Sequence, residues 1–349
     1  MEKQYAGICG ITQEELQTNF QPDIQVLVDE QNVTYFETLT ALKQWYDGYL
    51  FHQAGEEMYN PYSLLSAFAK KEIKSYWFNT GTPTFLVNFL KEAHYFIPDL
   101  DGKVELNETG LETYRAVVAQ DAVPILFQAG YLTIKEYIKD LRLYRLGFPN
   151  DEVRYGFWEN LLPAYSGLTF SQTGVWIGRF VQDIRKGDVN SFMERMQSII
   201  SGIPYDNLMA ENLKLREQNY QTAVYLIFAL MGPFVQTEIH CYSSAATDGD
   251  GSTQQRCFGG AETRSQNYTR MYSFDDATGR ADCVVTTVDA VYIFEFKLNG
   301  NGTAGDAIAQ IQKQNYAAQY KANGKKIVLI GSSFNEKTRT IKESAIANV

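Results

Sequence analysis

The sequence predicts an α/β protein of mixed α+β type, with a helical N-terminal part and a mixed-sheet C-terminal domain. Three observations lead to this prediction. Helix-capping patterns recur over residues 1–95, and β-rich runs appear over residues 121–165. Residues 279–334 then follow the order strand, strand, helix, strand, which is typical of a mixed α/β core. A chain of 349 residues has the length for two or three such units.

The N-terminal part, residues 1–100, is expected to be helical. ITQEELQTNF places Thr12 three residues before Glu15, which is a capping-box pattern. ALKQWYDGYLF has apolar residues at helical spacing as far as Tyr46, where an Asp-Gly pair breaks the pattern. YNPYSLLSAFAKK carries a cap at Asn60 and a proline at the first helical position.

Residues 101–168 are expected to form a β-containing connector. ILFQAGYLTIKEY and LRLYRLGFPNDEVRYGF are both β-rich and are joined by a short charged segment. Pro149-Asn150 marks a turn. We therefore predict a β-hairpin in this connector.

Residues 169–349 are expected to form one domain. A long apolar-periodic helix is predicted from Glu211 to Met231, and VQTEIHC follows as a strand. Residues 242–278 are polar, rich in Gly, Ser and Thr, and lack a clear period. A loop of this length is uncommon in a compact domain, so the segment is either a surface insertion or has short strands of its own.

The candidate chemistry lies in the hairpin formed by GRADCVVTT and AVYIFEFKL. Glu295 and Lys297 are two residues apart, so they project from one face of their strand. A tight turn centred between Val288 and Asp289 places Asp282 directly opposite Glu295. Directly opposed side chains have Cβ atoms about 4.5–5.5 Å apart.

Two carboxylates at that distance repel each other unless a cation lies between them. Mg²⁺ prefers oxygen ligands and could bridge Asp282 and Glu295. Lys297 adds a second cation, and the group could polarise a phosphodiester and lower the pKa of a bound water. The alternative is structural, because a Glu-x-Lys pair on a strand is usually a solvated face, and the bare pattern is common.

The order and spacing of GRAD, YIFEFKL, IAQIQKQNY and KKIVLIGSSF resemble the nuclease domain appended to bacterial AAA-ATPase-like proteins. That domain belongs to the PD-(D/E)XK nuclease superfamily, which implies a restriction-endonuclease-like mixed sheet. The resemblance implies that Asp282 and Glu295 are metal ligands and that Lys297 is the catalytic lysine.

Three further residues take roles from this resemblance. Gln310 and Tyr316 occupy positions where the family has a Gln and a Tyr on the helix after the lysine, and Gln310 joins the catalytic set. Glu217, in REQNYQ, lies where related enzymes supply a further acid that binds metal. The alternative for Glu217 is a solvent-exposed glutamate on a helix.

The upstream half resembles the lid-like C-terminal part of the AAA-ATPase-like domain, on CGITQEEL, KQWYDGYLF, YNPYSLL and YWFNTGTPTFLVNFL. The chain departs from the family in two ways. No G-x-x-x-x-G-K-[ST] phosphate loop is present, so we expect no ATP site and a chain shortened at its N-terminus. The insertion at residues 242–278 is also longer than is usual in the family.

Composition limits the other function classes. The net charge of −10, carried mostly by the first 199 residues, disfavours strong non-specific DNA binding. The four cysteines form no CxxC pair, and the three histidines lack the spacing of a zinc site. No signal peptide is evident, and the longest apolar stretch, about 13 residues, is too short to span a bilayer. We therefore expect a cytoplasmic protein without membrane contact.

The leading hypothesis is a Mg²⁺-dependent nuclease, with Mn²⁺ as an alternative metal and DNA favoured over RNA as substrate. Two other hypotheses stay open. The first is a non-catalytic interaction module that acts with a separately encoded ATPase or by self-association. The second is a shortened gene product without activity of its own.

Overall fold

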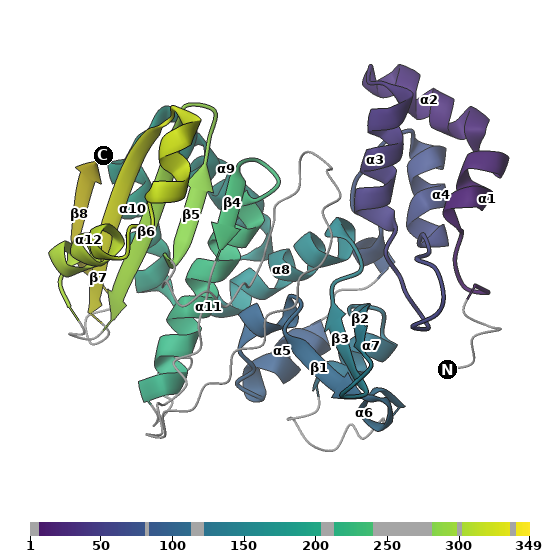
Figure 1. Ribbon diagram of the computed structural model, residues 1–349, viewed down its shortest axis with the longest axis horizontal. Helices are drawn as coiled ribbons and strands as arrows, with labels where there is room; N and C mark the ends of the chain where they lie inside the picture. Colours follow the sequence, from purple (N-terminus) through teal and green to yellow (C-terminus); the bar gives the residue numbers. More distant parts are fainter. Residues whose placement is uncertain are drawn as a thin grey trace. The chain divides into compact units, whose positions relative to one another are not determined.

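The computed structural model describes residues 7–80, 84–112, 122–203, 213–239, 281–298, 302–335 and 340–349. The chain forms two compact units, Met1–Ala164 and Tyr165–Val349, coloured purple to teal and teal to yellow in Figure 1. The mixed α/β class predicted from the sequence is confirmed. The finer division into residues 1–100, 101–168 and 169–349 stays a prediction.

The first part of the N-terminal unit is a group of four helices, three of which begin at a side-chain cap. Its helices are α1 (Gln13–Asn19), α2 (Gln21–Gln31), α3 (Tyr35–Tyr46) and α4 (Pro61–Lys70). The predicted capping box forms at α1, because the Thr12 hydroxyl accepts the Glu15 N–H and the Glu15 carboxylate accepts the Thr12 N–H. The Asn60 side chain caps α4 by accepting the Ser63 N–H. The helical prediction for this segment is confirmed.

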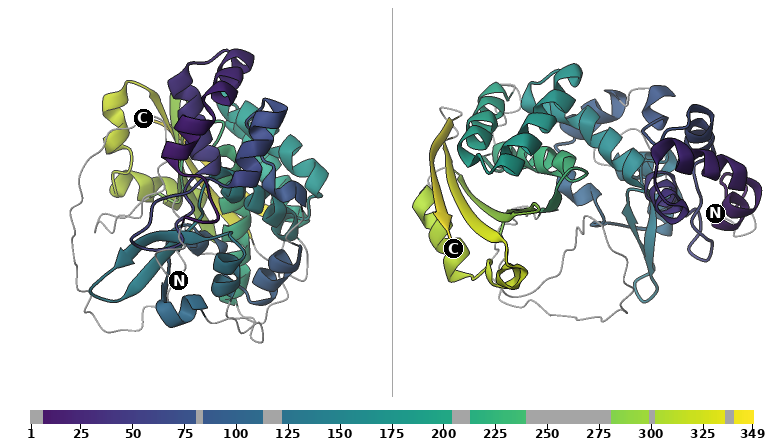
Figure 2. Two further views of the ribbon diagram at one scale, coloured as in Figure 1. Left: turned by 90° about the vertical axis from the view of Figure 1, so that its right-hand side faces the viewer. Right: turned by 90° about the horizontal axis from the view of Figure 1, so that it is seen from above.

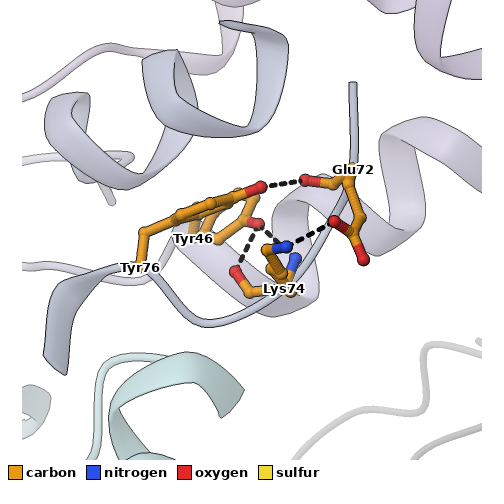
Figure 3. Close-up of polar contacts among 4 residues, drawn as sticks. All are labelled: Tyr46, Glu72, Lys74 and Tyr76. Carbon is orange, nitrogen blue, oxygen red and sulfur yellow. Dashed lines mark hydrogen bonds and ion pairs between the residues drawn. The ribbon is translucent and has the colours of Figure 1, made fainter. Parts of the chain in front are cut away.

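Tyr46, at the end of α3, connects this group to the chain that follows α4 (Figure 3). Its buried phenol donates a hydrogen bond to the Lys74 carbonyl (2.8 Å) and accepts one from the Lys74 N–H (2.9 Å). Tyr76 donates to the Glu72 carbonyl (2.7 Å), and the Lys74 ammonium pairs with the Glu72 carboxylate (2.5 Å). Burial raises the pKa of Tyr46, so the phenol stays protonated and can fill both roles.

The rest of the N-terminal unit combines short helices with a three-stranded antiparallel sheet of order β1-β3-β2. Its elements are η2 (Trp77–Thr80), α5 (Thr84–Glu92), η3 (Ile97–Leu100), β1 (Val104–Asn107), α6 (Glu108–Glu112), α7 (Ala122–Gln128), β2 (Thr133–Ile138), β3 (Leu143–Gly147) and α8 (Asp151–Ser166). Strands β2 and β3 form the hairpin that was predicted in the connector.

Two segments that we predicted as β-rich are helical instead. ILFQ forms the end of α7, because Gly130, with φ +78°, stops the helix before β2 begins. DEVRYGF forms the start of α8, because the Asn150 side chain accepts the Val153 N–H (3.1 Å) and Asp151 and Glu152 fill the first turn. Local capping chemistry outweighs the β propensity of the aromatic residues in these segments.

The turn after α3 packs closely against the turn before α8. The Asn150 amide donates to the Asp47 carbonyl (2.9 Å), and both residues are buried. Gly48 has φ +96°, and a Cβ at this position would lie 2.1 Å from the Pro149 carbonyl oxygen. Only glycine fits here, because the backbone conformation and the close approach both exclude a side chain.

The C-terminal unit contains a five-stranded sheet of order β4-β5-β6-β7-β8, in which β6 and β7 are parallel and the other pairs antiparallel. Its elements are α9 (Phe170–Lys186), α10 (Val189–Gly202), α11 (Leu213–Met231), β4 (Gln236–Ile239), β5 (Cys283–Thr286), β6 (Ala290–Leu298), α12 (Ala304–Lys313), η5 (Ala318–Asn323), β7 (Lys326–Asn335) and β8 (Thr340–Asn348). Strand β8 was not predicted from the sequence.

The two faces of strand β6 pack against different helices, as the right-hand view of Figure 2 shows. On one face the Tyr292 hydroxyl donates to the Ile184 carbonyl of α9, and the Phe294 ring contacts the Phe228 ring of α11. On the other face Ile293 packs with Ile311 of α12. This alternation decides which residues of β6 face α12.

Helix α11 matches the long apolar helix predicted from the sequence, and its first described residue is Leu213. It ends at Met231, directly before Gly232-Pro233, as predicted. Among the helices of the described ranges, none combines the length and the apolar character that crossing a bilayer requires.

The close approach of Gly48 to the Pro149 backbone can be tested by its effect on stability. Gly48→Ala should lower the free energy of unfolding by about 3 kcal/mol or more, because the new Cβ meets the Pro149 backbone. Gly102→Ala is the matched control, since Gly102 has φ +80° but open space around it, and it should cost only about 1 to 2 kcal/mol. Urea unfolding followed by circular dichroism measures both. Equal losses of unfolding free energy in the two variants would contradict a close contact between Gly48 and the Pro149 carbonyl.

Candidate active site

The β5–β6 hairpin has the register that the sequence predicts. Cys283 pairs with Phe294 and Thr286 with Val291, so the turn is centred between Val288 and Asp289. Continued by one residue beyond the start of β5, this register sets Asp282 opposite Glu295.

Asp282 is tied to the backbone of β6. Its Oδ2 atom accepts a hydrogen bond from the Phe296 N–H at 2.8 Å. The carboxylate therefore takes the place of a backbone acceptor just before the start of β5. This bond holds the Asp282 side chain beside the strand that carries Glu295 and Lys297.

Glu295 and Lys297 lie on the face of β6 that is covered by α12. Glu295 is only 3% exposed, and its Oε1 atom lies 3.1 Å from the Lys297 Nζ atom. The same Nζ atom donates to Oε1 of Gln310 on α12. The structure thus brings Glu295, Lys297 and Gln310 together, and the Phe296 hydrogen bond adds Asp282.

The contact with Gln310 depends on how closely α12 approaches the sheet. Gly331 of β7 pairs with Glu295 of β6, and a Cβ at Gly331 would lie 2.2 Å from the Ala304 carbonyl oxygen. The Glu343 carboxylate on β8 accepts the Ala304 N–H (3.1 Å) and so fixes the first residue of α12. Neither Gly331 nor Glu343 was singled out from the sequence. The signal for Gly331 was a glycine within a strand pattern, which marks close approach of another backbone.

Burial and mutual repulsion change the acidity of the two carboxyl groups. Burial, and then the negative charge of Glu295, raise the pKa of Asp282 to about 7, while the Phe296 N–H and the Lys297 ammonium oppose the rise. Burial also raises the pKa of Glu295, again against the effect of Lys297. Without a further cation the carboxyl pair therefore retains a proton until near neutral pH.

The two carboxylates fit a hard divalent cation. The Oε2 atom of Glu295 is buried and accepts no hydrogen bond from any residue that the structure describes. A buried carboxylate oxygen without a donor is costly, and a bound Mg²⁺ or Mn²⁺ would satisfy it. Within the described ranges, no group of three His, Cys, Asp or Glu residues gathers at one point. Asp282 and Glu295 are therefore a two-carboxylate set that needs further oxygen ligands.

The remaining predicted site residues and the insertion lie in different parts of the chain. Glu217 lies in α11, but its side chain is outside the described part of the chain, so its role as a metal ligand stays a prediction. Tyr316 is buried in the core cluster under α12, together with Ile311 and Tyr320. The insertion at residues 242–278 falls outside the described residues.

Comparison with known proteins finds a similarity to a protein family in this part of the chain. Residues 264–344 match the model of the PD-(D/E)XK nuclease superfamily, and the match includes Asp282, Glu295, Lys297 and Gln310. The five-stranded mixed sheet fits the restriction-endonuclease-like fold of that superfamily. The resemblance of the upstream half to AAA-ATPase-like proteins stays a prediction.

One curated relative matches almost the whole chain. It is an "Uncharacterized protein in vnfD 5'region" from Azotobacter chroococcum mcd 1, which is 29% identical over 349 residues. The match covers 98% of this chain, and the chain spans 57% of the length of that relative. No solved structure matches the chain.

The raised pKa of Asp282 predicts how stability depends on pH. A carboxyl group whose folded pKa is about 7 and whose unfolded pKa is 3.8 opposes folding increasingly between pH 4 and 7, and fully above pH 7. Asp282→Asn keeps an acceptor for the Phe296 N–H without a titrating proton. Its stability relative to wild type should therefore rise by up to about 4 kcal/mol from pH 4 to pH 8 in EDTA.

The control for this experiment is Asp306, whose pKa is lowered by the backbone N–H and the hydroxyl of Thr303. Asp306→Asn should lose stability relative to wild type at neutral pH and approach wild type as the pH falls. Urea unfolding at several pH values measures both slopes. A flat or falling difference for Asp282→Asn would contradict a buried, repelled carboxyl pair.

Proposed function

We propose that the PD-(D/E)XK nuclease superfamily domain at residues 264–344 is a metal-dependent phosphodiesterase that cleaves nucleic acid. One observation carries the proposal: the buried Glu295 carboxylate, the half-buried Asp282 carboxylate and a lysine lie together near one end of β6, and one oxygen of Glu295 has no described donor. The ion-paired Asp47 and Asp101 also each have one buried oxygen without a described donor, so the distinguishing feature is the pairing of two carboxylates beside a lysine. This arrangement suits a cation that comes from outside the chain.

Asp282 and Glu295 would hold Mg²⁺, with Mn²⁺ as the alternative, and Glu217 is proposed as a further acid. When bound, the cation supplies polarisation of the phosphodiester and a lower pKa for a coordinated water. Because its pKa is raised to about 7, Asp282 would have to release its proton to act as a ligand.

Lys297 would offset the negative charge that develops on the phosphate oxygens in the transition state. Its ammonium is held on one side by Glu295 and on the other by Gln310, so it needs little reorganisation when substrate binds. Gln310 is thus a positioning residue for the lysine. Both contacts hold the Lys297 side chain beside the carboxylate pair.

The substrate and setting are further parts of the proposal. DNA is proposed as the substrate in preference to RNA. ATP is not proposed as a ligand of this chain, because the sequence lacks the phosphate loop with which AAA-ATPase-like proteins bind ATP. The cytoplasm is the proposed location, in line with four cysteines that form no CxxC pair.

A second candidate function is a non-catalytic interaction module, which works with a separately encoded AAA-ATPase-like protein or by self-association. The specific observation in its favour is that only two carboxylates meet among the residues that the structure describes. The net charge of −10 also favours protein partners over nucleic acid. Metal binding without cleavage is the outcome that this candidate predicts.

Metal binding should stabilise the chain. At a free Mg²⁺ concentration about 100 times the dissociation constant, linkage adds about 2.7 kcal/mol, which corresponds to a Tm rise of roughly 5 to 10 °C. The rise should be larger at pH 8 than at pH 5, because protons compete for Asp282 below its pKa of about 7. Differential scanning fluorimetry measures the effect.

Glu295→Gln should abolish this rise, whereas Asp289→Asn, in the exposed turn of the same hairpin, should leave it intact. Glu217→Gln tests the third acid and should reduce the rise. If Glu295→Gln responds to Mg²⁺ as wild type does, the carboxylate pair is not the metal site.

Cleavage should depend on the lysine. Lys297→Ala should reduce the rate on fluorescently labelled DNA at least about 100-fold, because charge stabilisation in the transition state is lost. Lys313→Ala, on the same helix as Gln310 but exposed, should cleave at the wild-type rate. Gln310→Ala should fall between the two. Parallel assays on RNA test the preference for DNA, and cleavage that survives Lys297→Ala and Glu295→Gln would assign the activity elsewhere.

A further inference from the structure

A cavity of about 510 Å³ lies within the N-terminal unit. It is bordered by the loop after α3, by the β2–β3 hairpin and by helices α6 and α7. None of its lining residues belongs to the candidate active site. Its size suits a small organic molecule rather than an ion.

The walls of this cavity are aromatic. Its aromatic residues are Tyr49, Phe51, Phe127, Tyr137 and Tyr144. The first two rings stack on each other with centroids 6.1 Å apart, and the last two lie 4.8 Å apart on the hairpin. Tyrosine and phenylalanine faces bind flat heterocycles by stacking, and they do so in nucleobase sites of many folds.

The polar groups of the lining supply both donors and acceptors. His52 accepts the Ala54 N–H at Nδ1 (3.0 Å), so the neutral ring carries its proton on Nε2, which is a donor. The Gln128 amide nitrogen donates to the Leu111 carbonyl (3.1 Å), which leaves the Gln128 Oε1 atom as an acceptor. Glu108 adds an exposed carboxylate, the strongest acceptor of the set.

The charge of the lining selects among ligands. Among the lining residues that the structure describes, Glu108 is the one carboxylate, and none is a lysine or an arginine. Within this described lining a phosphate group would meet an anion and no cation, which disfavours nucleotides. A neutral ring with N–H groups on one edge would instead donate to Glu108.

The cavity is built before any ligand enters. The Thr133 hydroxyl accepts the Leu50 N–H (2.7 Å) and donates to the Leu50 carbonyl (3.1 Å), which ties the loop to the hairpin. Gly130, with φ +78°, takes the left-handed conformation that favours glycine and so fixes the turn between α7 and the hairpin. Preformed walls reduce the entropy cost of binding.

We propose that this cavity binds an uncharged purine base or nucleoside, stacked on the aromatic walls with its N–H edge on Glu108. Guanine is the preferred base, because its adjacent N1–H and amino group offer two donors to one carboxylate. Adenine offers an acceptor at the first of these positions and is bound less well. This site is independent of the proposed nuclease activity.

Isothermal titration calorimetry on the full chain tests the proposal with guanosine, adenosine, guanosine triphosphate and choline. Guanosine should bind saturably, adenosine and guanosine triphosphate each at least tenfold more weakly, and choline not at all. No saturable guanosine binding, or tighter binding of the triphosphate, would overturn the proposal. Choline binding without guanosine binding would also overturn it, by indicating an aromatic cage for cations.

Substitutions in and near the cavity test whether guanosine binds there. Glu108→Gln should weaken guanosine at least tenfold and reduce its advantage over adenosine, and Tyr137→Ala should weaken both nucleosides. Asp140→Asn, at the exposed end of the same hairpin and outside the lining, is the matched control. Circular dichroism confirms folding, and the exposed position of Glu108 keeps the test valid if Tyr137→Ala unfolds. Guanosine binding unchanged in Glu108→Gln would refute the assignment, and Asp282→Asn should bind as wild type does.

Discussion

The hydrogen bond from the Phe296 N–H to the Asp282 carboxylate is the contact on which the candidate active site depends. It joins the residue just before the start of β5 to the C-terminal part of β6, so it fixes how the two strands align. The Phe296 ring packs against Phe228 and Phe334 on the opposite face, which holds the strand from the other side. A slip of one residue would exchange the faces and bury Glu295 among aromatic rings.

Gln310, the site residue on α12, is brought to Lys297 by the packing of that helix on the sheet. Gly331 lets the helix backbone approach β7, and Glu343 accepts the N–H of its first residue. Both contacts lie at the N-terminal end of α12, two turns before Gln310. The amide that holds Lys297 is therefore positioned by residues that do not touch the lysine.

The sequence predicted the hairpin register because a period of two and a turn centre determine which residues oppose each other. It also predicted the caps at Thr12 and Asn60, which depend only on neighbouring residues. It did not predict β8, whose small and charged residues carry no strand pattern. It misassigned the start of α8, where Asn150 forms a cap that outweighs β propensity. The close contact between α12 and Gly331 joins residues that are far apart in the sequence, so local sequence patterns could not predict it.

The parallel pairing of β6 with β7 has a consequence for the order in which the site forms during folding. The β5–β6 hairpin closes a short loop, which takes microseconds, whereas β7 can join only after the chain has crossed back through α12. The two acids therefore meet before the helix delivers the amide to Lys297. On the ribosome the same order follows from synthesis, because Gln310 and β7 emerge after the hairpin is complete. An incomplete chain would hold its pair of acids in an open sheet edge, where metal ions can reach them before the fold closes.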